Sequence, residues 1–148
     1  MTPDAENPSL PQALRPSNGP KGPVLGIGVD IVETARIESS IERFGDRFLR
    51  RVFTEGEREY CGSMPHPARH YAARFAAKEA VSKAFGTGIG SRIGWRDVEV
   101  RRRESGEPYI ILHGPAADLA RSLNVREALI SLSHSDHYSV ANAVLVAG

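Results

Sequence analysis

The alanine-rich stretch from Arg74 to Gly88 constrains the fold of this chain more than any other segment. Four alanines, three within this stretch and one directly before it, recur at the spacing of one helix face. This spacing predicts a long helix, ended by glycine, that packs closely against a sheet through small side chains. The four are Ala73, Ala77, Ala80 and Ala84.

The same helix carries charged side chains at helical spacing. Glu79 and Lys83 lie four positions apart, and so do Arg74 and Lys78. Together with Ser82, these groups could hold a metal ion and a polyanion. The alternative is an ordinary helix whose charges face solvent in i,i+4 pairs, and the helix taken alone favours that alternative.

A second segment changes this balance. The run Val24–Val32 is rich in strand-forming residues but contains Asp30. A carboxylate in a buried strand is costly unless it is paired, hydrogen-bonded or bound to a metal. Asp30 and Glu79 could therefore converge on one hard cation such as Mg²⁺, with waters and phosphates as further ligands. A structural ion pair is the alternative.

Composition is that of one globular unit. The 148 residues are 41% hydrophobic and 25% charged, with a net charge of +1, so no overall field favours nucleic acid or membrane. The single Cys61 excludes an intrachain disulfide and a cysteine-rich metal cluster. No apolar run is long enough for a bilayer and no signal-peptide pattern is found, so we expect a cytoplasmic protein without a membrane segment.

The chain divides near Val24. Residues 1–23 hold six prolines and almost no bulky apolar side chain, so we predict a disordered tail followed by one domain at 24–148. Thr34 is expected to cap a first helix, Thr54 and Glu57 to form a capping box, and Asn124 to end the last helix. Expected helices cover 35–44, 46–52, about 55–60, 68–85 and 116–123, and expected strands cover 24–32, 97–103, 108–113, 127–133 and 138–146. This order predicts an α+β fold, a mainly antiparallel sheet wrapped on a long central helix.

Three blocks resemble the holo-[acyl-carrier-protein] synthases, which are 4'-phosphopantetheinyl transferases. They are GIGVDIVETARIE (26–38), RFAAKEAVSKAFGTGIG (74–90) and ISLSHSDHYSVANAV (130–144). The resemblance runs from about Val24 to the C-terminus and implies the fold of that family. It also implies transfer of 4'-phosphopantetheine from coenzyme A to a serine of apo-acyl carrier protein in fatty acid biosynthesis, by a homotrimer with active sites between subunits.

The resemblance assigns roles to individual positions. Asp30 and Glu79 match the family's Mg²⁺ ligands, and Lys83 matches a pyrophosphate contact, so these three are the expected catalytic residues. Ser133 and His134 are neighbours on a strand and point to opposite faces, which argues against a nucleophile–base pair. The expected coenzyme A site comprises Arg74, Ser82, Lys83, Gly106, Pro108 and His134. For Gly106 and Pro108, turn chemistry alone is the alternative.

Arginines also gather around the first two helices. The resemblance implies that the acidic second helix of acyl carrier protein docks there, with Arg36 at the matched position and Arg43 and Arg47 as helpers. Acidic residues are interleaved with them, so a solvated face is the alternative.

One loop departs from the resemblance. Many relatives carry Lys or Arg in the loop before the central helix, whereas this chain reads SMPHPARH at 63–70, where His66, Arg69 or His70 could substitute. Recognition of the 3'-phosphate is therefore left open. Two other functions are alternatives: a non-catalytic module that binds acyl carrier protein or a nucleotide, and an Mg²⁺-dependent pyrophosphatase. The intact set of Asp30, Glu79 and Lys83 favours the transferase.

Overall fold

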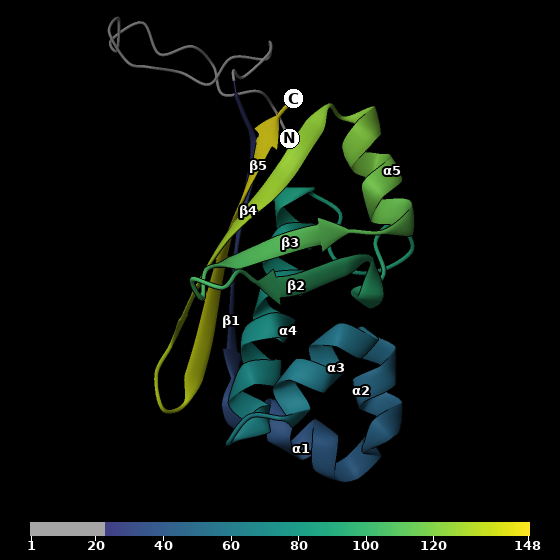
Figure 1. Cartoon of the computed structure of the whole chain (residues 1–148). Coiled ribbons are helices and arrows are strands. Elements are labelled where there is room, and N and C mark those ends of the chain that lie inside the picture. The colour runs from purple at the N-terminus through teal and green to yellow at the C-terminus, as the bar shows by residue number, and fades with distance from the viewer. Residues whose placement is uncertain (1–22) are drawn as a thin grey trace, which may run out of the picture.

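The fold is organised around one long helix, α4 (Pro67–Ala84), which lies across one face of a sheet (Figure 1). The computed structural model describes residues 23–148, so the predicted tail lies outside the described residues except for Pro23. The sheet contains β1 (Val24–Glu33), β5 (Tyr138–Ala147) and β4 (Val125–His134) in the order β1-β5-β4, and both pairings are antiparallel.

Two glycines of β1 allow α4 to approach the sheet closely. A Cβ atom at Gly28 would collide with the carbonyl oxygen of Ala80, and one at Gly26 with that of Ala84. The helix backbone therefore lies directly against the strand backbone. All four alanines of the predicted stripe are buried, which confirms the small-residue face. This close approach brings the middle of β1 next to the second half of α4.

A separate hairpin packs beside the helix. It consists of β2 (Val98–Arg102) and β3 (Pro108–Leu112), paired antiparallel, and it follows a short 3₁₀ helix, η1 (Trp95–Asp97). Its turn needs Gly106, whose φ is 91°. β3 lies alongside β4 without pairing to it, so the expected sheet is divided in two. The α+β class and the antiparallel pairing are confirmed.

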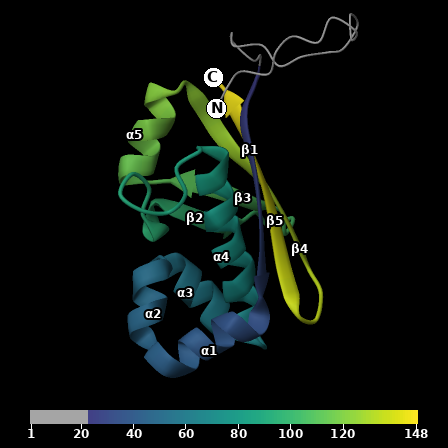
Figure 2. The ribbon, with the colours of Figure 1, turned by 180° about the vertical axis from the view of Figure 1, so that it is seen from behind.

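The remaining helices lie at the two ends of α4 (Figure 2). Three helices, α1 (Thr34–Phe44), α2 (Asp46–Val52) and α3 (Glu55–Gly62), cluster near its N-terminal end, and α5 (Gly114–Ser122) lies at the other end. The capping box of Thr54 and Glu57 is confirmed. Within residues 23–148, no helix has the length and apolar character needed to cross a membrane.

Two predicted caps are wrong in detail. Thr34 is the first residue of α1 and not its cap. Its backbone N–H donates to the carbonyl oxygen of His137 in the β4–β5 turn, so tertiary structure replaces the side-chain cap. At the end of α5, Leu123 is the C-cap, and Asn124 follows it in the left-handed region with φ 59°.

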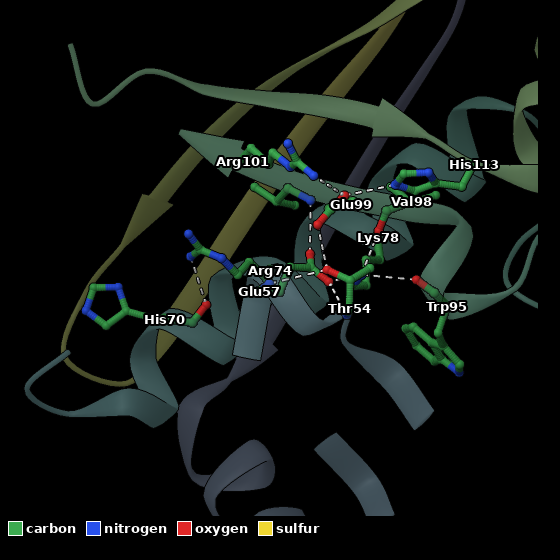
Figure 3. A network of polar contacts seen from close by, with 11 residues as sticks. Thr54, Glu57, His70, Arg74, Lys78, Trp95, Val98, Glu99, Arg101 and His113 are labelled. Carbon is green, nitrogen blue, oxygen red and sulfur yellow. Dashed lines mark hydrogen bonds and ion pairs between the residues drawn. The ribbon is translucent and has the colours of Figure 1, made fainter. Parts of the chain in front are cut away.

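A buried ion pair joins three elements around α4 (Figure 3). Lys78 Nζ lies 2.6 Å from Glu57 Oε1 and also donates to the carbonyl oxygens of Trp95 and Val98. Glu57 accepts from the backbone N–H groups of Thr54 and Val100. The charge is fully hydrogen-bonded, so the pair fixes α3 and β2 against α4, and Lys78 is not a solvated helix charge.

Candidate active site

The first cluster of functional side chains lies between β1 and α4. Lys83 Nζ lies 3.0 Å from Asp30 Oδ1 and 3.2 Å from the carbonyl oxygen of Val29. Glu79 stands one helical turn before Lys83 on the same flank of α4. The predicted convergence of Asp30, Glu79 and Lys83 is therefore present in the fold.

The two carboxylates of this cluster act on each other. Burial raises the pKa of Glu79, and the negative charge of Asp30 raises it further, while Lys83 and Arg36 lower it. Two close carboxylates favour a divalent cation, since each destabilises the other's charge when no cation is present. Among residues 23–148, no group of three or more His, Cys, Asp or Glu side chains forms a metal site. A pair of carboxylates nevertheless fits Mg²⁺, which takes its other ligands from water and phosphates.

A second cluster lines a cavity of about 360 Å³ on the other flank of α4. The cavity is bounded by the start of α4 and the loop before it, by the β2–β3 hairpin and by β4. Four of the six residues expected to bind coenzyme A line it: Arg74, Gly106, Pro108 and His134. The sequence prediction missed Arg102 of the hairpin, but it named His66, Arg69 and His70 as possible loop contacts, and all three line the cavity. No Asp or Glu is among its lining residues.

Arg74 is the buried arginine among the three arginines that line this cavity. The residue is only 3% exposed, and its guanidinium donates to the carbonyl oxygen of His70 at 3.3 Å. Within residues 23–148 it has no carboxylate partner, and its Nε atom makes no hydrogen bond. A buried cation without a counter-ion is costly, so this site is built for an anionic ligand. Burial lowers the pKa of His70, and the charges of Arg74 and Arg102 lower it further.

One chain does not bring the two clusters together. Arg74 and Lys83 are nine residues apart, so they project from α4 about 180° apart and about 13 Å along its axis. Lys83 does not line the cavity that holds Arg74. Ser82 joins neither cluster, because its hydroxyl is buried and donates to the carbonyl oxygen of Glu79 at 2.8 Å. The chain therefore carries two separate polar clusters.

The arginines expected to contact a partner are exposed on α1 and α2. Arg36 lies close enough to the first cluster to lower the pKa of Glu79. Arg43 stacks on the ring of Phe44, 5.3 Å from its centroid, and that ring is half exposed. Arg47 is exposed at the start of α2. The surface beside the carboxylates thus combines cations with one exposed aromatic ring.

Cys61 is excluded as a nucleophile. The thiol is fully buried, and burial raises its pKa to about 12. A thiolate is the reactive form, so this cysteine is inert in the folded protein.

Sequence comparison decides the family. A profile of the 4'-phosphopantetheinyl transferase superfamily matches residues 26–142. The holo-[acyl-carrier-protein] synthase of Koribacter versatilis is 49% identical over 122 residues, covering 82% of this chain and 98% of that protein. The chain belongs to the holo-[acyl-carrier-protein] synthase family. The synthase of Chlamydia trachomatis serovar L2 is 50% identical over 121 residues, with the same coverage.

Solved structures of holo-[acyl-carrier-protein] synthases share this fold. The synthase of Neisseria meningitidis aligns with a TM-score of 0.78 at 30% identity, covering 82% of this chain and 98% of that one. A Bacillus anthracis synthase solved in complex with coenzyme A (3',5'-ADP) aligns with a TM-score of 0.72 at 36% identity, covering 86% and 100%. Because the chain belongs to the synthase family, both clusters are expected to bind parts of the same substrate.

Proposed function

We propose that this synthase transfers 4'-phosphopantetheine from coenzyme A to a serine hydroxyl of apo-acyl carrier protein, in the cytoplasm and in fatty acid biosynthesis. The observation that carries the proposal is the division of polar groups into a carboxylate–lysine cluster and an acid-free cationic cavity. A pyrophosphate-containing nucleotide needs both kinds of site. The relatives' names point to the same reaction, and the complex of the Bacillus anthracis protein points to the same co-substrate.

In this reaction the serine oxygen bonds to the phosphorus that carries the pantetheine arm. The bond from that phosphorus to the bridging oxygen breaks, adenosine 3',5'-bisphosphate leaves with that oxygen, and the proton of the serine hydroxyl is released to water. Lys83 would place its ammonium group against the pyrophosphate oxygens, where charge changes during transfer. Arg74 and His134 would hold the nucleotide end in the cavity.

Asp30 and Glu79 fit Mg²⁺ as a pair of carboxylate ligands. Magnesium, when bound there, would neutralise charge on the pyrophosphate oxygens. Lys83 would then exchange its contact with Asp30 for one with the pyrophosphate. The ion pair of Lys83 with Asp30 thus keeps the carboxylate compensated until substrate and metal arrive.

In a homotrimer, the carboxylate–lysine cluster of one subunit and the cationic cavity of its neighbour would be the two half-sites of one active site. The outer face of β1 exposes Ile27, Val29 and Ile31 at 73%, 54% and 62%, and the residues paired with them on β5 are Val144, Asn142 and Val140. Such an apolar sheet face is typical of a surface that another chain covers. Lys83 lines a hollow of about 730 Å³ on this same face, together with Ile27 and Val29. Burial of the face would therefore also enclose the first cluster.

Arg36, Arg43 and Arg47 are the proposed contacts for acyl carrier protein. Arg36 lies near Glu79, so a partner docked there would deliver its serine to the carboxylate–lysine cluster. Complementary charge at this surface would mainly speed encounter.

The decisive experiment is intact-mass spectrometry of apo-acyl carrier protein incubated with the enzyme, coenzyme A and Mg²⁺. The expected result is a mass increase of one phosphopantetheine group and stoichiometric release of adenosine 3',5'-bisphosphate. Complex formation without a mass change would indicate a binding module. Consumption of coenzyme A with no change in the carrier protein would indicate a pyrophosphatase.

A further inference from the structure

Helix α4 is held from two opposite sides. One side carries the buried alanine stripe that faces β1. Lys78 stands two positions before Ala80 of that stripe, so it projects about 160° away around the helix axis. There its ammonium group lies 2.6 Å from Glu57 Oε1, and 3.0 Å and 2.6 Å from the carbonyl oxygens of Trp95 and Val98 (Figure 3). The helix therefore lies between β1 and a buried ion pair.

The two sides constrain α4 differently. The alanines and the glycines of β1 let the two backbones approach closely, but such small side chains leave almost no ridges to interlock. This contact fixes the distance between helix and strand more than the rotation of the helix. The ammonium group of Lys78 has three protons, and its three acceptors use all of them. Because hydrogen bonds are directional, these contacts fix the rotation of α4 about its own axis.

The acceptors of Lys78 are themselves fixed. Glu57 Oε1 also accepts from the backbone N–H of Thr54 at 2.9 Å, and Oε2 accepts from that of Val100 at 2.9 Å. The two carbonyl acceptors belong to η1 and to the first residue of β2. The side chains of Lys78 and Glu57 are both 0% exposed, so water does not compete for these bonds. The ion pair is therefore a rigid reference point for the helix.

The rotation of α4 decides where Glu79 points. This residue directly follows Lys78 in the chain, about 100° further around the helix. Its carboxylate has to reach the region of Asp30, which belongs to a different element, β1. Side-chain tips lie about 5–6 Å from a helix axis, so a rotation of about 10° moves them by about 1 Å. A displacement of about 1 Å can cost about 10²-fold in rate.

We propose that Lys78 and Glu57 are positioning residues, which set the rotation of α4 and so place Glu79 opposite Asp30. Neither side chain reaches the substrate, because both are fully buried. The proposal rests on the proposed function and deepens it, since it states what orients one carboxylate toward the other. Apolar side chains of similar size often stabilise a fold as well as a buried ion pair does, so stability alone does not explain this pair.

The test uses substitutions that remove the ion pair without leaving a buried charge. The double variant Lys78→Met with Glu57→Gln keeps side-chain size and removes both charges, whereas either neutralisation alone would leave one charge unpaired. Calorimetry measures Mg²⁺ binding to the substrate-free protein. Transfer assays measure kcat per folded protein, with the folded fraction taken from urea denaturation. Both Mg²⁺ affinity and kcat should fall about 10–100-fold, the range for groups that orient a metal ligand.

A second variant keeps both charges. Glu57→Asp shortens the carboxylate side chain by one methylene group, so Lys78 has to follow it or lose a contact. Mg²⁺ affinity and kcat should then each fall about tenfold.

Glu99→Gln is the matched control, because it removes another buried carboxylate that borders α3 and β2. Among residues 23–148, the side-chain hydrogen bonds of Glu99 go to Thr54, Arg101 and His113, which all lie outside α4. This variant should lower stability and leave Mg²⁺ affinity and kcat unchanged. It therefore separates a change in position from a loss of stability.

The outcomes separate this proposal from the proposed function. Wild-type Mg²⁺ affinity and kcat in a folded double variant, or in Glu57→Asp, would overturn the positioning role and leave the transferase standing. Equal losses in Glu99→Gln would also overturn it, because lower stability would then explain them. A wild-type protein that binds coenzyme A but transfers nothing to acyl carrier protein would contradict the proposed function itself.

Discussion

Lys83 and Asp30 form an ion pair at 3.0 Å across the boundary between α4 and β1, although 53 positions separate them. The lysine side chain is half exposed, so the pair is open to solvent and to ligands. The ammonium group of Lys83 thus pairs with the carboxylate of Asp30, which we propose as a metal ligand. With Asp30 as the proposed metal ligand, lysine and metal would compete for this carboxylate in the absence of substrate.

This competition predicts opposite effects of one substitution. Lys83→Met should strengthen Mg²⁺ binding to the substrate-free enzyme several-fold, because a cation is removed from the carboxylates. It should nevertheless lower kcat by about 10²–10³-fold, as for loss of one electrostatic donor. Calorimetry with Mg²⁺ alone and steady-state transfer assays measure the two effects. Weaker Mg²⁺ binding by Lys83→Met would contradict the geometry.

The carboxylates themselves should be indispensable. Glu79→Gln keeps the size of the side chain and removes its charge, so it should lower transfer by at least about 10³-fold while the protein stays folded. Glu59→Gln, an exposed glutamate on α3, is the matched control and should retain wild-type turnover. Near-normal turnover by Glu79→Gln at saturating Mg²⁺ would remove Glu79 from the site.

The sequence predicted those parts of the fold that depend on local pattern. The alanine stripe of α4 follows from periodicity, the strand β1 follows from its strand-forming residues, and the capping box follows from Thr54 and Glu57. Burial of Arg74, Lys78 and Ser82 could not be predicted this way, because it depends on elements that arrive later in the chain, such as η1 and β2. A helix viewed alone left Arg74, Lys78 and Ser82 as possible polar groups on the surface.

The candidate site shows the same limit. Resemblance named Asp30, Glu79 and Lys83, and the fold brings them together. It gave no indication that Arg74 and Lys83 lie on opposite flanks of α4, although the nine-residue spacing already contained that information. The pairing of Tyr60 with Arg102 was missed because 42 positions separate them and neither lies in a matched block.

The exposed face of β1 should hold the oligomer together. Val29→Glu places a charge in the middle of that face, so it should convert a trimer into monomers and abolish transfer. Leu123→Glu, at an equally exposed apolar position after α5, is the matched control and should stay assembled. Sedimentation equilibrium of both variants decides the matter. A Val29→Glu protein of unchanged mass would place the interface elsewhere.

Charge reversal on α1 should act on one substrate only. Arg36→Glu should raise KM for acyl carrier protein about tenfold or more, because it puts like charge against an acidic helix. It should leave KM for coenzyme A almost unchanged, since the nucleotide cavity is built from other elements. Added salt should weaken wild type more than the variant, because screening removes attraction that the variant has already lost. Steady-state kinetics with each substrate varied in turn, at low and moderate salt, measures this. A change in KM for coenzyme A alone would contradict the docking assignment and favour the alternative that these arginines form a solvated face.

Glu99 should make stability depend on acid pH. Burial alone would raise the pKa of this carboxyl, but hydrogen bonds from Thr54 and His113 and the charge of Arg101 outweigh burial and lower the pKa (Figure 3). A lowered folded pKa stabilises the fold above the unfolded pKa, and this contribution is lost as the pH falls through the folded pKa.

Glu99→Gln should therefore lower the free energy of unfolding by about 1–3 kcal/mol at pH 7. The difference from wild type should shrink as the pH is lowered below about 4. Urea denaturation at several pH values measures it. Glu104→Gln in the hairpin turn is exposed and should show no difference at any pH. A destabilisation by Glu99→Gln that is the same at pH 7 and pH 3 would assign the effect to packing and not to charge.

The proposed trimer with half-sites on neighbouring subunits predicts complementation between inactive subunits. Glu79→Gln damages the carboxylate–lysine cluster, and His134→Ala damages the cationic cavity, so each homotrimer should be inactive or nearly so. If each site takes one cluster from one subunit and the cavity from its neighbour, a subunit carrying only His134→Ala still offers an intact first cluster. A subunit carrying only Glu79→Gln still offers an intact cavity. Random mixing in equal amounts should then restore about a quarter of wild-type activity, because both intact halves meet at about one site in four.

The subunits are mixed after reversible dissociation, and the transfer assay is repeated. A doubly substituted chain mixed with wild type is the control, and its activity should also fall to about a quarter of that of wild type. No recovery in the mixed single variants, with trimers confirmed by mass, would place both clusters of one site on the same chain.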